Sequence, residues 1–333
     1  MKSEARYYKK LENQTVRCQL CPANCKLKPG KLGFCDSRFN KDGILFTDNF
    51  GETVTVSLDP IEKKPLYHFL PDTNIVSIGA NACNMTCKHC QNWQISQTKV
   101  PTTYIAPAAL PDVGRQNRSI GVAYTYTEPI IWFEYIMESA PLVKQAGLAN
   151  VMVTNGYINP EPLEELLPLI DAFNVDLKSI RPEFYSKICG GKLEPVKNTI
   201  KRIASSDSHL ELTYLVITGL NDSDDDFAQL GEFIASVDKK IPLHISAYHP
   251  SYKLDLPATD TITLKNAYEI LSSHLSYVFV GNREIKGCSD SRCQSCGKTL
   301  IIRSGYQIAV DAVDSRGNCR ECGQSSEIII SIQ

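Results

Sequence analysis

Three cysteines, Cys83, Cys87 and Cys90, lie close together in the order Cys-x3-Cys-x2-Cys, with no fourth cysteine nearby. Iron–sulfur clusters are usually held by four cysteines, so three thiolates suit a 4Fe–4S cluster whose fourth iron is open to a ligand. A structural zinc ion takes four ligands, and zinc here would need His89 or a distant residue. Disulfides are the third alternative, but three neighbouring thiols cannot pair evenly. The spacing favours the open cluster.

The elements around these thiols predict an α/β fold. An apolar, β-branched run at 74–79 reads as a buried strand and places the thiols on the loop after it, where α/β barrels carry their chemistry. Apolar runs then alternate with helical periodicity as far as residue 280, which is typical of parallel βαβ units. We expect six or so units, a partial (β/α)6 TIM-like barrel. The strands are expected near 75–79, 119–125, 150–154, 172–177, 210–217, 242–247 and 277–280.

Four cysteines close to the N-terminus form a second group: Cys18, Cys21, Cys25 and Cys35. They lie within eighteen positions and can close around one centre. Zinc and a second 4Fe–4S cluster both fit thiolate ligands, so the metal stays open between them.

The third group is Cys293, Cys296, Cys319 and Cys322, two Cys-x2-Cys pairs each followed by glycine. Two such pairs bring four sulfurs to one tetrahedral ion, as in zinc ribbons. Residues 300–303 and 306–310 read as two small strands joined at 304–305. A closed four-thiolate site has no open position for chemistry, so we expect a structural role. Binding of nucleic acid or a protein partner is the alternative. Cys189 and Cys288 are left over.

The composition is that of an ordinary globular protein. The chain has 333 residues, 43% of them hydrophobic and 22% charged, with a formal net charge of -2. This charge gives no basic excess for broad nucleic-acid or membrane binding. No apolar signal core or run of about 18 apolar residues is present, so we expect a cytoplasmic protein in which the clustered cysteines, but not all thirteen, bind metals. The expected domains are residues 1–70 (Cys-rich segment and linker), 71–285 (barrel) and 286–333 (zinc ribbon).

Polar residues at the ends of the predicted strands are the candidates for the active site. Two further features concern the segments around the predicted barrel. The segment 59–68, with its charges beside Pro60 and Pro65, is either a solvated linker or packs near the cluster. Pro141 lies within an apolar helical stretch, where a proline kinks or restarts a helix. The strand-end candidates are Glu128, Asn155, Asp176, Lys178 and His244, with His249 as a candidate substrate or catalytic residue.

The cysteine triplet, with His89 before its last member, resembles the signature of the radical S-adenosylmethionine (radical SAM) superfamily. The chain is more closely similar to relatives of pyruvate formate-lyase-activating enzyme called AmmeMemoRadiSam-system radical SAM enzymes. This resemblance rests on Asp-Pro-Ile-Glu-Lys-Lys-Pro-Leu-Tyr-His (59–68), Cys-Gln-Asn-Trp (90–93) and His-Ile-Ser-Ala-Tyr-His-Pro (244–250). The N-terminal motifs Cys-Gln-Leu-Cys-Pro (18–22) and Gly-Phe-Cys (33–35) are also part of this resemblance.

The resemblance implies cofactors and roles. The triplet would hold a 4Fe–4S cluster that cleaves S-adenosylmethionine reductively, and the 5′-deoxyadenosyl radical would abstract hydrogen from an unidentified substrate. Glu128 would contact the methionyl amino group, although Tyr126 and Thr127 replace the usual two glycines before it. Lys178 would reach the carboxylate, Asp176 a ribose hydroxyl or a cation, and His244 the nucleoside.

The resemblance also implies partners. These are a one-electron reductant such as flavodoxin or ferredoxin and, as candidates, AMMECR1-like and Memo-like proteins. Two alternatives stay open: an activating protein for a glycyl-radical enzyme, and a non-enzymatic metal-binding interaction module. In the activating enzymes that carry extra clusters, the additional cysteines usually follow the radical motif, whereas here one group precedes it.

Overall fold

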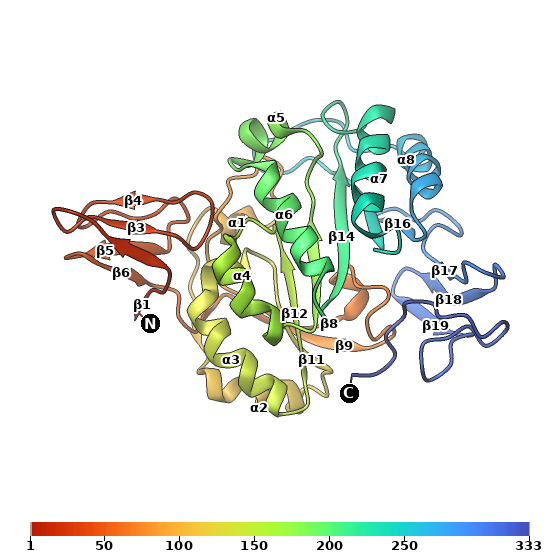
Figure 1. Cartoon of the computed structure of the whole chain (residues 1–333), viewed down its shortest axis with the longest axis horizontal. Helices are drawn as coiled ribbons and strands as arrows, with labels where there is room; N and C mark the ends of the chain where they lie inside the picture. Colours follow the sequence, from red (N-terminus) through yellow and green to blue (C-terminus); the bar gives the residue numbers. More distant parts are fainter. Residues whose placement is uncertain (1, 333) are drawn as a thin grey trace.

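The centre of the protein is one sheet of eight strands (Figure 1), in a computed structural model that describes residues 2–332. The strand order is β16-β15-β14-β13-β12-β11-β9-β8; all neighbours are parallel except β8, which pairs antiparallel with β9. The strands are β8 (Thr55–Pro60), β9 (Asn74–Gly79), β11 (Gly121–Tyr124), β12 (Ala149–Thr154), β13 (Ala172–Asp176), β14 (His209–Val216), β15 (Leu243–Ala247) and β16 (Val278–Gly281). Each parallel strand lies within two residues of its expected range, so the α/β prediction is confirmed. Among the residues described, no strand pairing joins β8 to β16 and closes the sheet.

Amphipathic helices follow the strands, and Figure 1 shows α3, α4, α6 and α7 in front of the sheet. The buried faces have helical spacing: Val196, Ile200 and Ile203 of α6 are all fully buried. The helices of seven or more residues are α2 (Leu110–Gln116), α3 (Phe133–Gln145), α4 (Pro160–Leu166), α6 (Leu193–Ala204), α7 (Asp224–Asp238) and α8 (Thr261–His274). Shorter turns are η1 (Ile61–Lys63), α1 (Trp93–Ser96), η2 (Pro107–Ala109), η3 (Pro129–Trp132), η4 (Leu167–Leu169), α5 (Pro182–Phe184) and the π-turn η5 (Tyr185–Cys189). In residues 2–332 no helix has the length and apolar character needed to cross a membrane.

Pro141 lies inside α3, and the helix continues through it to Gln145. Of the two outcomes expected at Pro141, a kink or a restart, the restart was therefore wrong. Tertiary packing explains the difference, because Ile136, Ala140 and Val143 on either side of the proline are fully buried against the core. Their burial offsets the backbone hydrogen bond that proline cannot donate.

Two small β-rich regions lie at opposite ends of the molecule (Figure 1). The predicted C-terminal hairpin is confirmed, with β18 and β19 pairing antiparallel, but its turn lies at Gly305 and Tyr306, one residue later than expected. The N-terminal strands are β1 (Ser3–Glu4), β2 (Tyr8–Lys10), β3 (Val16–Cys18), β4 (Lys26–Leu27), β5 (Arg38–Lys41) and β6 (Ile44–Thr47); β7 (Glu52–Thr53) pairs with β10 (Thr103–Tyr104). The C-terminal strands are β17 (Ser291–Arg292), β18 (Thr299–Ser304) and β19 (Gln307–Val310).

The segment 59–68 is packed into the protein and is not a solvated linker. Its last residue, His68, is fully buried, and Glu211 of β14 accepts hydrogen bonds from the backbone N–H groups of Tyr67 (3.0 Å) and His68 (2.7 Å). The ring of His68 is hydrogen-bonded to Ser291 of β17 at 3.0 Å, and Arg303 of β18 donates to the carbonyl of Tyr67 at 2.6 Å. This segment therefore joins the central sheet to the C-terminal hairpin.

Replacing His68 with asparagine is expected to reduce the loss of stability at mildly acidic pH. Burial lowers the pKa of His68 to about 3, against the opposing charge of Glu211. In the unfolded chain the pKa of histidine is about 6.5. The stability that neutral His68 contributes is therefore complete above about pH 6.5, and it is lost as the pH falls toward the pKa of the folded state. Between about pH 7.5 and about pH 5.5 we expect the variant to lose about 1 kcal/mol less than the wild type.

The measurement is the free energy of urea unfolding of the full chain at the two pH values. His249→Asn is the matched control, because His249 is exposed. If His68→Asn and the wild type lose the same amount, the buried neutral imidazole is not the cause.

Candidate active site

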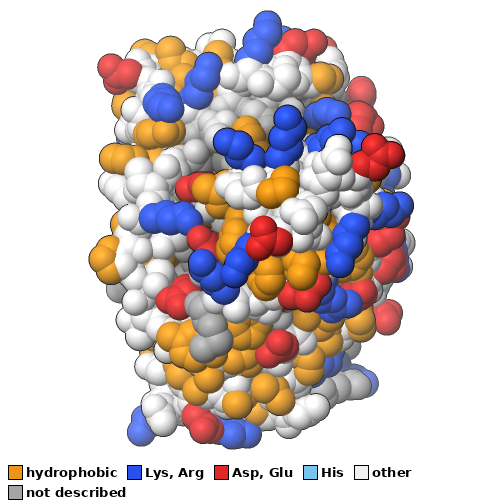
Figure 2. Space-filling view, turned by 90° about the vertical axis from the view of Figure 1, so that its left-hand side faces the viewer, with side chains coloured by type: hydrophobic (Ala, Val, Ile, Leu, Met, Phe, Trp, Pro, Cys, Tyr) orange, Lys and Arg blue, Asp and Glu red, His pale blue; other side chains and the backbone are white. Residues whose placement is uncertain are grey.

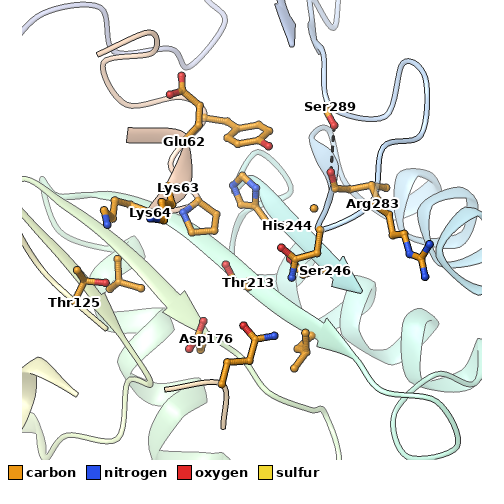
Figure 3. A pocket seen from close by; sticks show the side chains of 18 of the residues that line it. Glu62, Lys63, Lys64, Thr125, Asp176, Thr213, His244, Ser246, Arg283 and Ser289 are labelled. Atoms are coloured by element: carbon orange, nitrogen blue, oxygen red, sulfur yellow. Dashed lines mark hydrogen bonds between the residues drawn. The ribbon is translucent and has the colours of Figure 1, made fainter. Parts of the chain in front are cut away.

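A cavity of about 1430 Å³ lies at the carboxyl ends of the parallel strands. Figure 3 shows Asp176, Thr213, His244 and Ser246 around it, from the strands β13, β14 and β15. The residues expected at strand ends therefore meet in one place, with Glu128, Asn155, Asp176, Lys178 and His244 all in the cavity wall.

The opposite wall comes from two segments outside the barrel pattern. Glu62, Lys63 and Lys64 of the segment 59–68 line it (Figure 3), and so does the β18–β19 hairpin through residues 302–306. The loop after β16 adds Arg283 and Ser289, and the hydroxyl of Ser289 donates to the carbonyl of Val280 at 3.1 Å. The cavity is larger than the 300–1,000 Å³ usual for a single small ligand, so it can hold a cluster, a cosubstrate and a substrate together.

Cys83, Cys87 and Cys90 all line this cavity on the loop after β9. The loop is held by backbone hydrogen bonds from Thr86 to the carbonyl of Cys189 (2.8 Å) and from Lys88 to that of Ile188 (2.9 Å). Burial raises the pKa of Cys83 well above its usual range, so the free thiol stays protonated and a bound metal would be needed to hold the thiolate.

Donors surround these sulfur atoms. The amide of Asn155 is 3.7 Å from the Sγ of Cys83, and the hydroxyl of Ser96 is 3.2 Å from the Sγ of Cys90. Such donors stabilise thiolate charge, and three thiols on one cavity wall fit an iron–sulfur cluster with one open iron.

Sequence reasoning gave Cys189 no role, yet the structure places it beside the triplet. The Sγ of Cys189, the Sγ of Cys87 and a ring nitrogen of His89 lie within 4.8 Å of one another, and all three side chains are buried. The Nδ1 of His89 has no hydrogen-bond partner among the residues described. No local pattern could have found Cys189, because it lies 99 residues after Cys90 on the turn that holds the cysteine loop.

Glu128 lies at the cavity with both carboxylate oxygens hydrogen-bonded. It accepts from the N–H of Ile130 (3.0 Å), the hydroxyl of Thr154 (2.7 Å) and the N–H of Asn155 (2.8 Å). Glu128 therefore caps η3 and ties it to the end of β12. Burial raises its pKa to about 7 even though these donors favour the charged form.

Tyr126 occupies the left-handed region with φ of 68°. Glycine adopts this conformation most easily, so the backbone here is of the kind that a glycine would provide. The strain is offset by contacts, since the hydroxyl of Tyr126 donates to buried Asp59 and the Nζ of Lys64 lies 4.8 Å from its ring centre. Asp59 also binds Lys64 at 2.7 Å. The sequence drew attention to Tyr126 as a departure from the family pattern, but not to this cluster.

Asp176 and Lys178 form an ion pair at 3.0 Å at the end of β13. Burial alone would lower the pKa of Lys178, but Asp176, Cys87 and Cys189 raise it well above its usual range. Lys178 therefore carries a firm positive charge on the cavity wall. The pair could open to bind a carboxylate and a hydroxyl group, or remain a local salt bridge.

The two histidines of the 244–250 stretch lie in different environments. His244 lines the cavity, and its Nε2 is 2.6 Å from Glu211. His249 is exposed and is not among the residues that line the cavity, because the chain leaves the sheet after Ala247. The structure therefore does not bring His249 to the other candidates.

The two outer cysteine groups differ in geometry. At the C-terminus, the sulfur atoms of Cys293 and Cys322 lie 3.6 Å apart and those of Cys296 and Cys319 lie 3.7 Å apart. Four sulfurs at about 2.3 Å from one tetrahedral ion stand about 3.8 Å from one another, so this group fits zinc. The N-terminal four line a separate cavity of about 20 Å³.

Comparisons with known proteins agree with this site. The family model of the radical SAM superfamily matches residues 77–234. An uncharacterized protein of Methanocaldococcus jannaschii is 37% identical over 98% of this chain and 99% of its own length. Pyruvate formate-lyase 1-activating enzyme of Escherichia coli K12 is 24% identical over 174 residues, which cover 50% of this chain and 71% of that enzyme.

The crystal structure of Streptococcus suis SuiB bound to S-adenosylmethionine has a similar fold. It superposes with a TM-score of 0.51 and 12% identity, over 62% of this chain and 52% of that one. At this identity the likeness concerns the fold alone, and it agrees with an α/β fold built on a mostly parallel sheet.

Proposed function

Since the chain belongs to the radical SAM superfamily and is an enzyme, we propose that it holds a 4Fe–4S cluster at Cys83, Cys87 and Cys90 and acts on a substrate in the adjoining cavity. Superfamily membership implies such a cluster, S-adenosylmethionine and a reductant. When bound, the cluster supplies the electron that cleaves S-adenosylmethionine to methionine and a 5′-deoxyadenosyl radical, which abstracts hydrogen from the substrate. The observation that carries the proposal is that the three thiols and the five polar candidates line one cavity.

The chain's own residues would position the cosubstrate. The charge on Lys178 suits the methionyl carboxylate and the carboxylate of Glu128 suits the amino group, because charge-assisted hydrogen bonds are the strong ones. Asp176, released from Lys178, can accept from a ribose hydroxyl. His244, whose Nε2 is held by Glu211, lines the cavity and would contact the nucleoside. Asn155 would keep its contact with Cys83 and so help to stabilise the thiolate.

We also propose that the chain belongs to the AmmeMemoRadiSam group within the superfamily. The resemblance rests partly on residues 59–68 and on the start of 244–250. Both stretches contribute residues to the cavity wall, which supports a functional role for them. AMMECR1-like and Memo-like proteins are then candidate partners, and flavodoxin or ferredoxin is a candidate reductant.

A second candidate function is the activation of a glycyl-radical enzyme, favoured by the similarity to the Escherichia coli activating enzyme. The hairpin of residues 302–306 in the cavity wall argues against it, because a partner's glycine loop would have to enter past this hairpin. A glycyl-radical signal in electron paramagnetic resonance, seen after mixing with a glycyl-radical enzyme, would favour activation. Its absence alongside turnover of a small molecule would favour the first function.

The experiment that tests the proposal uses the full chain, reconstituted without oxygen and given S-adenosylmethionine and dithionite. We expect 5′-deoxyadenosine and methionine in equal amounts. If iron is bound and reducible but no 5′-deoxyadenosine forms, the proposal is wrong.

Replacing Glu128 with glutamine is expected to weaken the binding of S-adenosylmethionine by about tenfold or more, the value of one charge-assisted hydrogen bond. The carboxylate must be ionised to pair with the amino group, and its pKa is raised to about 7 by burial. Affinity should therefore rise as the pH increases from about 6 toward about 7.5, and the variant should lose this rise.

Isothermal titration of the reconstituted protein measures both effects. Glu164→Gln, at an exposed ion pair with Arg202, is the control. If Glu128→Gln lowers the melting temperature while affinity and its pH dependence stay unchanged, Glu128 is a helix cap and not a ligand.

A further inference from the structure

The four N-terminal cysteines surround a common space. Cys18 ends β3, Cys21 and Cys25 lie on the following turn, and Cys35 precedes β5. All four line the cavity of about 20 Å³. The rest of its lining is largely apolar, including Leu20, Phe34 and Ile131.

This arrangement differs from that of the C-terminal four. Within residues 2–332, the C-terminal sulfurs lie within 4.8 Å of one another, whereas the N-terminal sulfurs form no such group. Thiolates that share one zinc ion stand about 3.8 Å apart. Thiolates of an iron–sulfur cluster bind different irons and so stand farther apart, with the cluster between them. The wider N-terminal arrangement favours a cluster.

A buried cation faces the same space. Arg38 is 1% exposed and lines the cavity, and its guanidinium binds both oxygens of Glu134 at 2.5 and 2.7 Å. Its Nε, however, is buried and has no hydrogen-bond partner among the residues described. A buried N–H without a partner has lost the hydrogen bond that it makes to water in the unfolded chain, so it points to a missing acceptor. The sulfur atoms of a cluster would be such acceptors.

The N-terminal cavity and the active-site loop share a wall. Asn84, between Cys83 and Met85, lines the N-terminal cavity. Its Oδ1 accepts from the amide of Asn155 at 2.8 Å, and the same amide lies 3.7 Å from the Sγ of Cys83. One residue thus connects the two cysteine groups.

The surface around the N-terminal group is basic, although the whole chain has a net charge of -2. Residues 2–41 contain ten Lys and Arg but three Asp and Glu. All ten except Arg38 are exposed. Figure 2 shows Lys and Arg side chains gathered in the upper part of the face at this end of the molecule. Such a surface attracts an acidic protein.

From these observations we propose that Cys18, Cys21, Cys25 and Cys35 hold a second 4Fe–4S cluster, which receives electrons from an acidic one-electron carrier protein and passes them to the active site. The second half rests on the proposed function. The reduced carrier loses one electron, the N-terminal cluster gains it and then returns to its oxidised state as the active-site cluster is reduced. No bond is formed or broken in this relay.

Metal analysis of the reconstituted full chain tests the site. We expect Cys21→Ala to lose about four irons per chain, the content of one such cluster, and to keep its zinc. Cys288→Ala, outside the three groups, is the matched control and should lose neither metal; Cys25→Ser serves as the second variant if Cys21→Ala does not fold. Loss of zinc with iron unchanged, or no change in either metal, overturns the proposal.

The electron relay is tested by comparing two reductants, dithionite and reduced ferredoxin. Cys21→Ala should form 5′-deoxyadenosine with dithionite, which can reach the active site itself, but at most a tenth of the wild-type amount with reduced ferredoxin. Equal turnover with ferredoxin overturns the relay. Failure of the proposed function is distinguishable, because the wild type would then give no 5′-deoxyadenosine with either reductant while the iron lost in Cys21→Ala still reports the N-terminal cluster.

Discussion

Cys87→Ala is expected to abolish the formation of 5′-deoxyadenosine. Cys87 is the most buried thiol of the triplet, on a loop held by backbone hydrogen bonds to residues 188 and 189. With one ligand gone, two thiolates remain for a cluster that needs at least three here. We expect turnover to fall to the background of a reaction without enzyme, with a loss of the active-site iron signal.

The control is Cys296→Ala, which removes a thiol of the same type from the C-terminal group. Cys296 lies outside the cavity wall, and its sulfur packs 3.7 Å from that of Cys319. This variant should lose zinc and melt at a lower temperature, while active-site iron and 5′-deoxyadenosine formation persist below that temperature. Equal turnover by Cys87→Ala and the wild type would count decisively against the assignment of the triplet.

Glu211→Ala is expected to destabilise the protein by about 4 kcal/mol or more, because each buried donor left without an acceptor costs about 1–3 kcal/mol. Glu211 is fully buried in β14 and accepts four hydrogen bonds: two from backbone N–H groups and two from ring nitrogens of His209 (2.9 Å) and His244 (2.6 Å). Burial raises its pKa, but the two histidines outweigh burial and hold the pKa well below its usual range.

Urea unfolding of the full chain at neutral pH measures this loss. Glu164→Ala is the matched control, since Glu164 is half-exposed in its pair with Arg202 and such pairs contribute little. A similar unfolding free energy for Glu211→Ala and the control would mean that the carboxylate does not hold the segment 59–68 in place.

Much of the fold and part of the site could be predicted from the sequence. The parallel strands are short runs of mostly buried apolar residues, a local pattern that burial on both faces imposes. The cysteine triplet lies on one loop, and each C-terminal Cys-x2-Cys pair spans only four residues, so both are local signals. The polar residues at strand ends meet because parallel strands share one carboxyl edge, as with Asp176 and His244.

What could not be predicted depends on contacts between distant segments. The burial of His68 is caused by Glu211 and Ser291, 143 and 223 residues away. The neighbourhood of Cys189 and Cys87 depends on how η5 packs against the cysteine loop. The exposure of His249 depends on where the chain leaves the sheet. A sequence motif shared with a family does not reveal that position.

The contacts of Arg303 and Ser291 with the segment 59–68 bear on how the polypeptide can be dissected. A truncation ahead of residue 286, at the boundary that the sequence proposes for the last domain, would leave the carbonyl of Tyr67 and the ring of His68 without their partners. It would also uncover the reaction chamber on the side of the hairpin. The catalytic portion expressed alone is therefore expected to be less stable than the full chain and to have a more open cavity.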